Sequence, residues 1–446
     1  MARARKGWTR LRGLVGAATL LVAWGGAAHA EDAVEQIGIS ARAKARGGAD
    51  VAVGDSPLSQ VENPATISLH GHALDSSYQL ILPRTRWDSP LDSAYSEFGA
   101  IPLFNFAGTH PINDRLSLGA AFFTKSGLAG QYHARHRFFP RQELIEHVDV
   151  LNFALPLNLS YKVTERLSLG AGIRAEFSTA RLLSVLGPID ANLQRGYAWG
   201  GGFQVGALYQ VTRDFRLGLG YRSTTWMGDF QGNHLLVTPS PLLTMQPPQT
   251  IDVGDARTTA RLPQKLNLGA SWDVTERLKL SSDVRWINYA ESFAGESTVR
   301  TRGVPPLAPG LPPLVPREFK LPFGYRDQFV LAVGADRKFT DNLTLSAGYN
   351  YASPVLPGRN LYPLSSVLPQ HHVTVGANYR RGNWSIGGGY ILGVTQGITS
   401  GPSALPGNIP PGLLPGPLAG GVRNDFANSF ISQTQHSIFL GIGYQY

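Results

Sequence analysis

The residues best placed to do chemistry are two pairs of opposite charges set inside alternating, largely apolar segments. Arg174 and Glu176 form one pair, and Asp283 and Arg285 form the other. Side chains two positions apart lie on the same face of a β-strand, so each pair can form an ion pair on one face. Charges kept away from water are mostly paired, because an unpaired buried charge is strongly destabilising. The spacing therefore favours an internal charge network over a catalytic site.

Patterns typical of enzymes and metal sites are not found in the sequence. There is no Cys, which excludes thiol nucleophiles and zinc–thiolate sites, and there is no Gly-x-Ser-x-Gly elbow. The eleven His show no metal-type helical spacing. His371 and His372, like His436 and Ser437, are neighbours that point to opposite faces of a strand and cannot form a nucleophile–base pair. We therefore expect no enzyme activity, no metal and no cofactor.

Three further side chains are candidates for binding a ligand. Phe123 and Lys125 share one face of an alternating segment, where they either hold the tail and head of a ligand or simply line a wall. Arg181 can neutralise a carboxylate through a charge-assisted hydrogen bond. Alternatively, it forms a salt bridge with Glu176 or Asp190. Both alternatives are open for each of these sites.

A repeated phrase predicts the strands that would position these residues. A polar turn followed by an alternating apolar run occurs six times, starting at residues 113, 164, 212, 275, 340 and 381. The intervals of 41 to 65 residues fit two strands and one longer loop, which is the hairpin unit of a transmembrane β-barrel. Six short turns separate seven hairpins and predict fourteen strands. Charged residues facing lipid are costly, so the polar, Gly-rich face of each strand is expected to line the lumen.

The N-terminal residues predict export. Five basic residues precede an apolar stretch over residues 14–24, and Ala28-His29-Ala30 offers a small-x-small cleavage site. We expect residues 1–30 to be a signal peptide, whose removal lowers the formal net charge from +9 to +4. No basic cluster with interleaved aromatics remains, so nucleic-acid binding is not expected. No later segment has the roughly twenty apolar residues of a membrane helix, which leaves a barrel, or else a soluble all-β protein.

The loops opposite the short turns are unusually apolar. Residues 235–249, 304–316 and 401–421 hold sixteen of the thirty-one prolines, with leucines such as Leu413 and Leu414 between them. Polar loops would be expected around the mouth of an aqueous porin. The leucines either pack on one another or form a surface that captures a hydrophobic compound. The aromatic C-terminal strand, ending in Tyr446, is similar to the signal read by the outer-membrane assembly machinery.

Several short blocks resemble one known family. They are Ala45-Arg46-Gly47-Gly48-Ala49, Asn63-Pro64-Ala65, Ser126-Gly127-Leu128-Ala129, Tyr221-Arg222-Ser223, Gly324-Tyr325-Arg326-Asp327 and Ser353-Pro354-Val355. Each block alone is a weak signal, but their order and spacing are specific. The chain is similar to the FadL-type outer-membrane transporters of long-chain fatty acids and aromatic hydrocarbons, over essentially its whole length after residue 30.

The resemblance implies an all-β fold, a 14-stranded antiparallel transmembrane β-barrel with an N-terminal hatch inside its lumen. The hatch is expected over residues 31–64, which do not alternate and are rich in Gly and Ala, and the barrel over residues 65–446. Asn63, Pro64 and Ala65 would form the hatch motif. The charge network of Arg174, Glu176, Asp283 and Arg285 is then expected to position the hatch. A closed barrel leaves no edge strand to pair, which favours a monomer.

The resemblance also implies passive transport of a hydrophobic small molecule. Outer loops would capture it, an inner pocket near the hatch would hold it, and a lateral exit at a kink in the third strand would release it into outer-membrane lipid. Gly127 is the expected lateral gate, because Gly inside a strand permits a bulge or kink. Ser184 stands where fatty-acid members place an arginine. This difference leaves room for an uncharged hydrocarbon as the substrate in place of a fatty acid. From the residues themselves, His133, Arg135, His136 and Arg137 in a predicted outer loop are expected to contact lipopolysaccharide phosphates. The alternative function is a general or substrate-specific aqueous porin.

Overall fold

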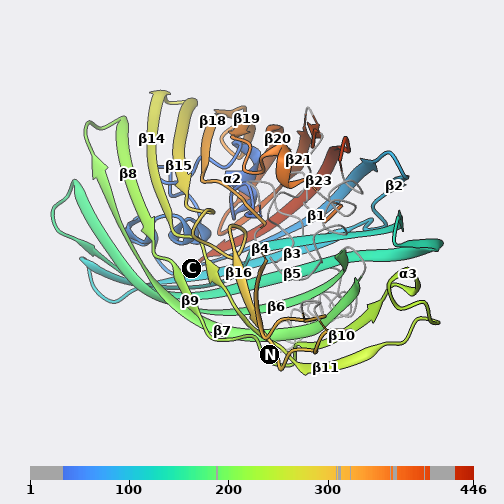
Figure 1. Ribbon diagram of the computed structural model, residues 1–446. Coiled ribbons are helices and arrows are strands. Elements are labelled where there is room, and N and C mark those ends of the chain that lie inside the picture. The colour runs from blue at the N-terminus through green and yellow to red at the C-terminus, as the bar shows by residue number, and fades with distance from the viewer. Residues whose placement is uncertain are drawn as a thin grey trace, which may run out of the picture.

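The computed structural model describes residues 34–446 except for 187–188, 308, 310–312, 322, 362, 365–368, 396 and 402–426. Within these residues, fourteen long antiparallel strands form a closed barrel (Figure 1). The strands are β1 (Ala73–Asp88), β3 (Ile101–Pro111), β4 (Leu116–His136), β5 (Phe139–Lys162), β6 (Leu167–Leu186), β7 (Ile189–Gln210), β8 (Phe215–Arg222), β14 (Lys265–Thr275), β15 (Leu278–Ile287), β18 (Gln328–Lys338), β19 (Leu343–Ala352), β20 (His371–Arg381), β21 (Trp384–Val394) and β23 (Phe430–Gln445). The prediction of fourteen strands is confirmed.

The six repeated phrases form the tight turns between paired strands. In the turn between β3 and β4, the Asn113 side-chain oxygen accepts hydrogen bonds from the backbone N–H groups of Arg115 and Leu116, both at 2.9 Å. Thr164, Thr275 and Thr340 do the same with their hydroxyls in three other turns. Asn and Thr recur at these positions because their side chains bond the backbone two or three residues on.

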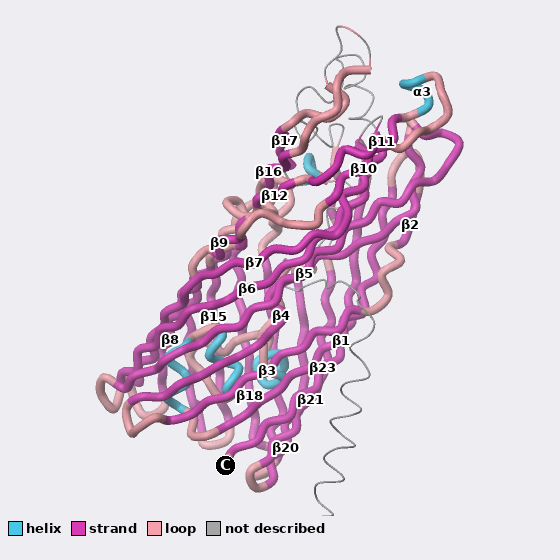
Figure 2. The backbone as a smooth tube through the Cα atoms, turned by 90° about the horizontal axis from the view of Figure 1, so that it is seen from below, coloured by secondary structure: helices cyan, strands magenta, loops and turns pink. Residues whose placement is uncertain are grey.

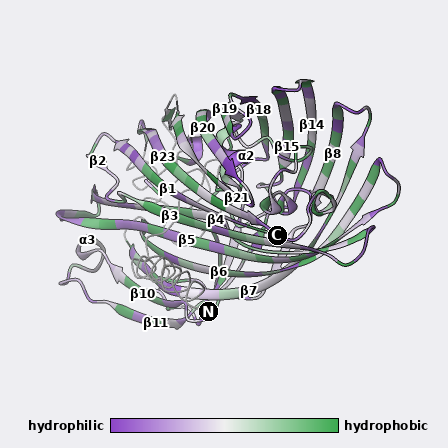
Figure 3. Ribbon diagram, turned by 180° about the vertical axis from the view of Figure 1, so that it is seen from behind, coloured by the Kyte–Doolittle hydropathy of each residue, from purple (hydrophilic) through white to green (hydrophobic). Residues whose placement is uncertain are grey.

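Side chains alternate between the lumen and the outer surface along each strand. On β6, Leu169 and Ile173 are exposed on the outer surface, whereas Ser168, Arg174 and Glu176 are buried inside. The strands are accordingly banded green and purple in Figure 3. The exposed aromatic side chains at the turn end of the barrel include Tyr161, Tyr209, Tyr379 and Trp384. Such alternation, with aromatic residues at the rim, is typical of a barrel surrounded by lipid.

Shorter elements cover the end of the barrel opposite the tight turns (Figure 2). They are β2 (Ser93–Tyr95), β9 (Thr225–Met227), β10 (His234–Pro239), α3 (Pro241–Thr244), β11 (Ile251–Asp255), β12 (Arg257–Thr259), β13 (Arg261–Leu262), β16 (Ser297–Arg300), β17 (Glu318–Leu321), η3 (Gly358–Asn360) and β22 (Ile398–Thr399). Leu235 and Leu314 are buried there in one cluster with Val253 and Val299, so these leucines pack on their neighbours. Leu242 and Leu307 remain exposed. Leu413 and Leu414 lie outside the described residues.

The N-terminal segment occupies the lumen as three short helices: α2 (Ala41–Ala45), η1 (Pro57–Val61) and η2 (Pro64–Leu69). We use the name hatch for residues 34–70. Figure 2 shows these helices enclosed by the strands, and η2 contacts β4 to β7 while α2 contacts β19 to β23. The expected boundary between residues 64 and 65 falls within the start of η2, and the first strand begins at Ala73.

Each hatch helix begins at a polar cap. Ser40, Ser56 and Asn63 accept hydrogen bonds from the backbone N–H groups of Ala43, Leu58 and Ala65, at 3.0, 3.1 and 3.0 Å. Pro follows directly after two of these caps, at Pro57 and Pro64. Pro fits the first position of a helix, where its missing N–H is not needed. The Asn63-Pro64-Ala65 motif is therefore the start signal of η2.

Inward-facing glycines of the wall give the hatch its space. A Cβ atom at Gly170 would collide with the backbone of Pro64 and Ala65. One at Gly348 would collide with the backbone of Arg46 and Gly47 in the same way. The repeated Gly on the lumen face is thus explained by close approach of two backbones.

Candidate functional site

The barrel wall has a break between two strands that are consecutive in sequence. Pairing of β3 with β4 runs from Pro111–Ser117 to Asn105–Phe123 and then stops, although β4 continues to His136. Within the described residues, Ile101–Phe104 pair with β1 alone. The register of β4 against β5 also shifts between Thr124 and Ser126, which leaves Lys125 as an extra residue. A β-bulge of this kind bends its strand, so β4 turns away from β3.

The first described residues of the hatch fill the break. Glu35 forms an antiparallel bridge with Ser126, and the Gly127 N–H donates to the Val34 carbonyl at 3.0 Å. On the other side of the break, the Gln36 amide exchanges two hydrogen bonds of 3.1 Å with the Asn105 amide of β3. Gln36 also donates to the Thr124 carbonyl of β4. The segment Val34–Gln36 thus replaces β3 as the hydrogen-bonding partner of β4 in the break.

Gly127 lies in the break, but it is not among the glycines with positive φ in the described residues. The left-handed backbone that only Gly adopts easily is therefore not used at this position. The irregularity of β4 centres on Lys125, two residues earlier. The contact that Gly127 makes in the break is its hydrogen bond to the Val34 carbonyl.

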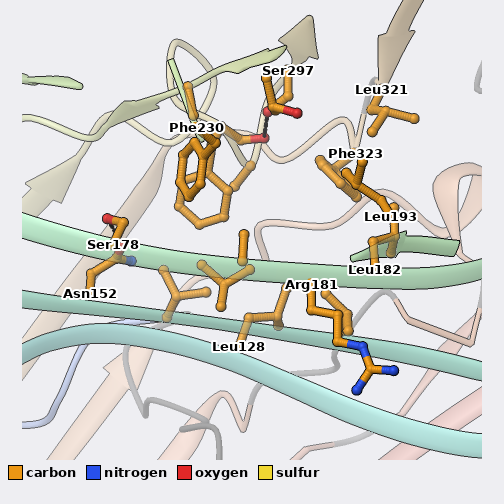
Figure 4. A pocket seen from close by; sticks show the side chains of 18 of the residues that line it. Leu128, Asn152, Ser178, Arg181, Leu182, Leu193, Phe230, Ser297, Leu321 and Phe323 are labelled. Atoms are coloured by element: carbon orange, nitrogen blue, oxygen red, sulfur yellow. Dashed lines mark hydrogen bonds between the residues drawn. The ribbon is translucent and has the colours of Figure 1, made fainter. Parts of the chain in front are cut away.

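An apolar cavity lies directly behind the break, between the outer parts of β4 to β7 and the loops above them (Figure 4). Its empty volume is about 890 Å³, including the open mouth. The apolar lining residues are Val34, Leu128, Val148, Val150, Ala180, Leu182, Leu193, Met227, Phe230, Ala260, Leu262, Phe293, Ala294, Leu321, Phe323 and Leu364. Val34 and Leu128 belong both to the cavity and to the break, so the hatch N-terminus separates the two spaces.

Below the cavity, a group of buried charges pairs within the wall. The Lys125 ammonium and the Arg174 guanidinium each lie 2.8 Å from the Glu176 carboxylate. Lys125 also donates to the Thr225 hydroxyl at 3.0 Å. All three charges of this group are buried, and their mutual pairing offsets part of the desolvation cost.

A second group of charges holds the hatch directly. Glu35 pairs with Arg222 and, at 3.2 Å, with Lys265, and Lys265 lies 2.8 Å from Glu62. Burial alone would raise the pKa of Glu35, but the charges of Arg222 and Lys265 lower it to about 2. The pKa of Glu62 is lowered for the same reason, chiefly by Lys265 against the effect of burial. Both hatch carboxylates therefore remain charged at neutral pH and anchor the segment that fills the break.

The other predicted pair also contacts the hatch, at a different place. The Asp283 carboxylate accepts hydrogen bonds from the backbone N–H groups of Asp50 and Val51, at 2.7 and 3.1 Å. Arg285 donates to the Gly48 carbonyl. The four residues predicted as one network thus form two groups, one around Glu176 and one around residues 48–51.

The remaining predicted site residues are placed as follows. Phe123 is buried against hatch residues Ile39, Leu58 and Val61 rather than in the cavity. Lys125 belongs to the buried charge group. Arg181 borders the cavity, but Figure 4 shows its guanidinium directed away from the apolar space.

Sequence reasoning missed Glu35, Glu62, Arg222 and Lys265. The signal available for Arg222 and Lys265 was their position on the polar faces of neighbouring strands, where they are paired in register. Nothing in the sequence pointed to Glu35, which lies in a segment without periodicity.

Within the described ranges, no cluster of three His, Asp or Glu side chains is arranged to hold a metal ion. The part of the chain that the structure describes contains no helix that is long and apolar enough to cross a membrane.

Comparisons with known proteins agree with this architecture. The crystal structure of a FadL homologue from Pseudomonas aeruginosa superimposes with a TM-score of 0.74 and 17% identity, covering 92% of this chain and 99% of that one. The toluene transporter TodX of Pseudomonas putida gives a TM-score of 0.71 and 18% identity over 92% and 99% of the two chains. At such identities the likeness shows the fold.

Sequence relatives point to the same group. A long-chain fatty acid transport protein of Salmonella typhi is 24% identical over 273 residues, which is 56% of this chain and about 60% of the length of that relative. Outer membrane protein P1 of Haemophilus influenzae is 23% identical over 394 residues, covering 75% of this chain and 79% of the relative. Residues 19–380 match the model of the family described as outer membrane protein transport protein (OMPP1/FadL/TodX). Because this match spans most of the chain, the protein belongs to that family and is an outer-membrane β-barrel.

Proposed function

We propose that this protein lets hydrophobic small molecules cross the outer membrane passively, and that they leave the barrel sideways through the break between β3 and β4. The observation that carries the proposal is the position of Val34. Its side chain lines the apolar cavity, while its carbonyl accepts the Gly127 N–H in the break. One hatch residue therefore stands between a compartment suited to an apolar ligand and a gap in the wall.

The physical advantage of such a route is that the ligand avoids water. Each square ångström of apolar surface returned to water costs about 25 cal/mol, so an apolar ligand released into an aqueous lumen would lose what it gained in the cavity. A ligand that moves from the cavity through the break enters lipid instead. Displacement of Val34–Gln36 is the one step needed to join the two compartments.

The contacts of the segment suit a movable plug. Apart from the Glu35 ion pairs, its hydrogen bonds to the rest of the described barrel are those at Asn105, Thr124, Gly127 and Tyr289, and Val34 is its one side chain in the apolar cluster. The Glu35 ion pairs with Arg222 and Lys265 favour the filled state. Segments with few buried apolar contacts are those that open at low free-energy cost.

Capture is the first step of the proposed path. Leu242 and Leu307 are exposed at the outer end of the barrel, as a capture surface requires. Leu413 and Leu414, in the Pro-rich segment beyond the described residues, stay predicted members of that surface. The relatives named as transporters of long-chain fatty acids and of toluene support a hydrophobic substrate. The lining of the cavity decides which of these two classes the present chain would accept.

A reversible cross-link tests the exit. In an antiparallel bridge of this type, Glu35 and Ser126 form the close, non-hydrogen-bonded pair, whose geometry suits a disulfide. The chain has no other Cys, so Glu35→Cys with Ser126→Cys can form only this bond within the protein. Oxidation should stop uptake of labelled toluene or fatty acid by cells, and a reductant should restore it.

Controls separate the cross-link from the substitutions. Each single Cys variant should transport equally with and without oxidant. Undiminished uptake by the fully cross-linked barrel would contradict exit through the break. Release of the ligand can be located with the same variant in liposomes that carry a membrane-bound fluorescent reporter.

A further inference from the structure

The apolar cavity contains a buried hydroxyl that has no partner. Tyr325 lines the cavity, is 5% exposed, and its hydroxyl has no hydrogen-bond partner among the described residues. Its position is fixed: the ring meets Tyr289 edge-on at 6.3 Å, and its backbone N–H donates to the Ala294 carbonyl at 3.0 Å. A buried hydroxyl without a partner is destabilising unless a bound molecule supplies the missing acceptor.

Most other polar groups in the lining are already satisfied. Ser178 donates to the Asn152 amide oxygen, and the Ser297 hydroxyl donates to the Phe293 carbonyl at 3.3 Å. The exception besides Tyr325 is the side-chain oxygen of Asn233, which also lacks a partner in the described structure. The cavity therefore offers one free donor-acceptor group and one free acceptor.

The cavity does not offer a cation. Arg181 is the only basic residue in the described lining, and its guanidinium is directed away from the apolar space (Figure 4). Lys125 and Arg174, in the charge group below, are both paired with Glu176 at 2.8 Å. A carboxylate entering the cavity would lose its hydration without gaining a counter-charge, which disfavours charged ligands.

We infer that the cavity selects uncharged apolar molecules that carry one hydrogen-bonding group, such as a phenol or an alcohol, and that the Tyr325 hydroxyl recognises this group. The inference rests on the proposed function and specifies its substrate class. A hydrocarbon would fit the apolar walls but would leave the hydroxyl unsatisfied. A fatty-acid carboxylate would satisfy the hydroxyl but would lack a cation.

Three probes of matched skeleton test the inference: toluene, 4-methylphenol and 4-methylbenzoate, bound at pH 7 to the full-length protein in detergent and measured by calorimetry. Tyr325→Phe removes only the hydroxyl. The dissociation constant for 4-methylphenol should rise about five-fold in this variant, the factor expected for one net hydrogen bond. That for toluene should change by less than about two-fold, and 4-methylbenzoate should bind more weakly than 4-methylphenol. Comparing variants with each ligand cancels differences in ligand solubility.

Tyr289→Phe is the matched control, because the Tyr289 ring packs beside Tyr325 but its hydroxyl already accepts the Val34 N–H at 3.4 Å. It should affect 4-methylphenol and toluene alike. Equal effects of Tyr325→Phe on the binding of those two ligands would overturn the inference. The inference would also be overturned if 4-methylbenzoate bound more tightly than the other two probes and lost this affinity in Arg181→Gln. Uptake of 4-methylphenol and of toluene by cells carrying the wild-type protein reports separately on transport. Absence of uptake of both compounds would overturn the proposed function itself.

Discussion

Two seams of the barrel differ in a way that the order of the chain does not explain. β1 and β23 come from opposite ends of the chain, yet they pair without a gap from Ala73–Gln445 to Asp88–Phe430. β3 and β4 are joined by a tight turn, yet their pairing stops at Asn105–Phe123 while β4 extends to His136. Closeness in sequence therefore does not decide where the wall is continuous.

The difference lies in what each strand meets on its open side. In β1, all residues from Ala73 to Asp88 pair in register with β23. In β4, the extra residue Lys125 redirects the strand, and Val34–Gln36 of the hatch takes over as partner. Backbone groups at membrane depth need partners, so a break in the wall is stable only where another segment covers it. At β4, the segment that covers the break is the N-terminus of the hatch.

Deletion of the hatch should change the difference between the two seams the most, because it uncovers the break and leaves the β1–β23 ladder untouched. Removal of Glu31 to Glu62 takes α2 and η1 out of the lumen, but it leaves η2 and the β1–β23 ladder in place. We expect a folded barrel with heat-modifiable migration in electrophoresis, and a rise from near-zero ion conductance to that of an open pore in planar bilayers. Conductance equal to that of the full-length protein would contradict the assignment of the hatch as the seal.

Substitution within β4 should have the next largest effect. Gly127 donates its N–H to the Val34 carbonyl at 3.0 Å, so Gly127→Val places a bulky, β-branched side chain in the break and should narrow the exit. We expect hydrophobic uptake to fall about ten-fold, with normal amounts of assembled barrel.

The control for this substitution must be a glycine of the same strand that has room for a side chain. A Cβ at Gly130 meets only the Tyr132 ring, at 3.5 Å, so Gly130→Val should transport nearly normally. Gly119 is unsuitable, because a Cβ there would lie 2.5 Å from Gln60 and 2.7 Å from Ile67 of the hatch. Equal loss of transport in Gly127→Val and Gly130→Val would show that the strand, rather than the break, is sensitive.

Hydrogen exchange should distinguish the two seams without any mutation. Residues 124–130 pair with β5 on one side but meet only the hatch on the other, whereas residues 76–82 pair with β23 and nearly all of them also with β3. Amides on the hatch side of residues 124–130, such as that of Gly127, should therefore exchange about ten-fold faster or more than those of residues 76–82. Exchange of the purified barrel in detergent, followed by mass spectrometry of peptides, measures both regions in one experiment. Similar protection in the two regions would mean that the hatch segment is as firmly held as a strand.

A pH effect should be the smallest. The pKa of Glu35 is lowered to about 2 from an ordinary value near 4.5, so its ion pairs stabilise the filled break above pH 4.5. This stabilisation is lost as the pH falls from about 4.5 towards 2, where the folded protein takes up the proton. We expect open-channel noise in bilayers to increase below pH 4. Glu35→Gln should show increased noise already at pH 7 and a weaker dependence on pH. Identical pH profiles for the two proteins would exclude Glu35 as the group responsible.

Local patterns predicted the wall of the barrel well. The turn phrases gave the strand number because Asn and Thr bond the backbone within a few residues, as at Asn113 and Thr164. Alternation separated the lumen from the lipid side because each strand has a period of two. The family resemblance and the outer-membrane location are confirmed by the match over residues 19–380, and membership in a transport family confirms that the chain is not an enzyme.

The site was less predictable because its contacts join distant segments. Glu35 is paired with Arg222, 187 positions away, and no periodicity relates them. The bulge at Lys125 breaks the alternation that placed Phe123 and Lys125 together, so that Thr124, Lys125 and Ser126 are all buried. The roles proposed for Phe123, Lys125, Arg181 and Gly127 stay predictions until variants are measured.

The inward glycines have a consequence for how the protein is built. The hatch precedes β1 in the chain, and its helices contact strands from β1 to β23, in places through gaps that only Gly leaves open. No partial set of strands therefore offers the hatch its complete binding surface. That surface is complete only when β23 has joined β1, so the seating of residues 34–70 depends on closure of the ring.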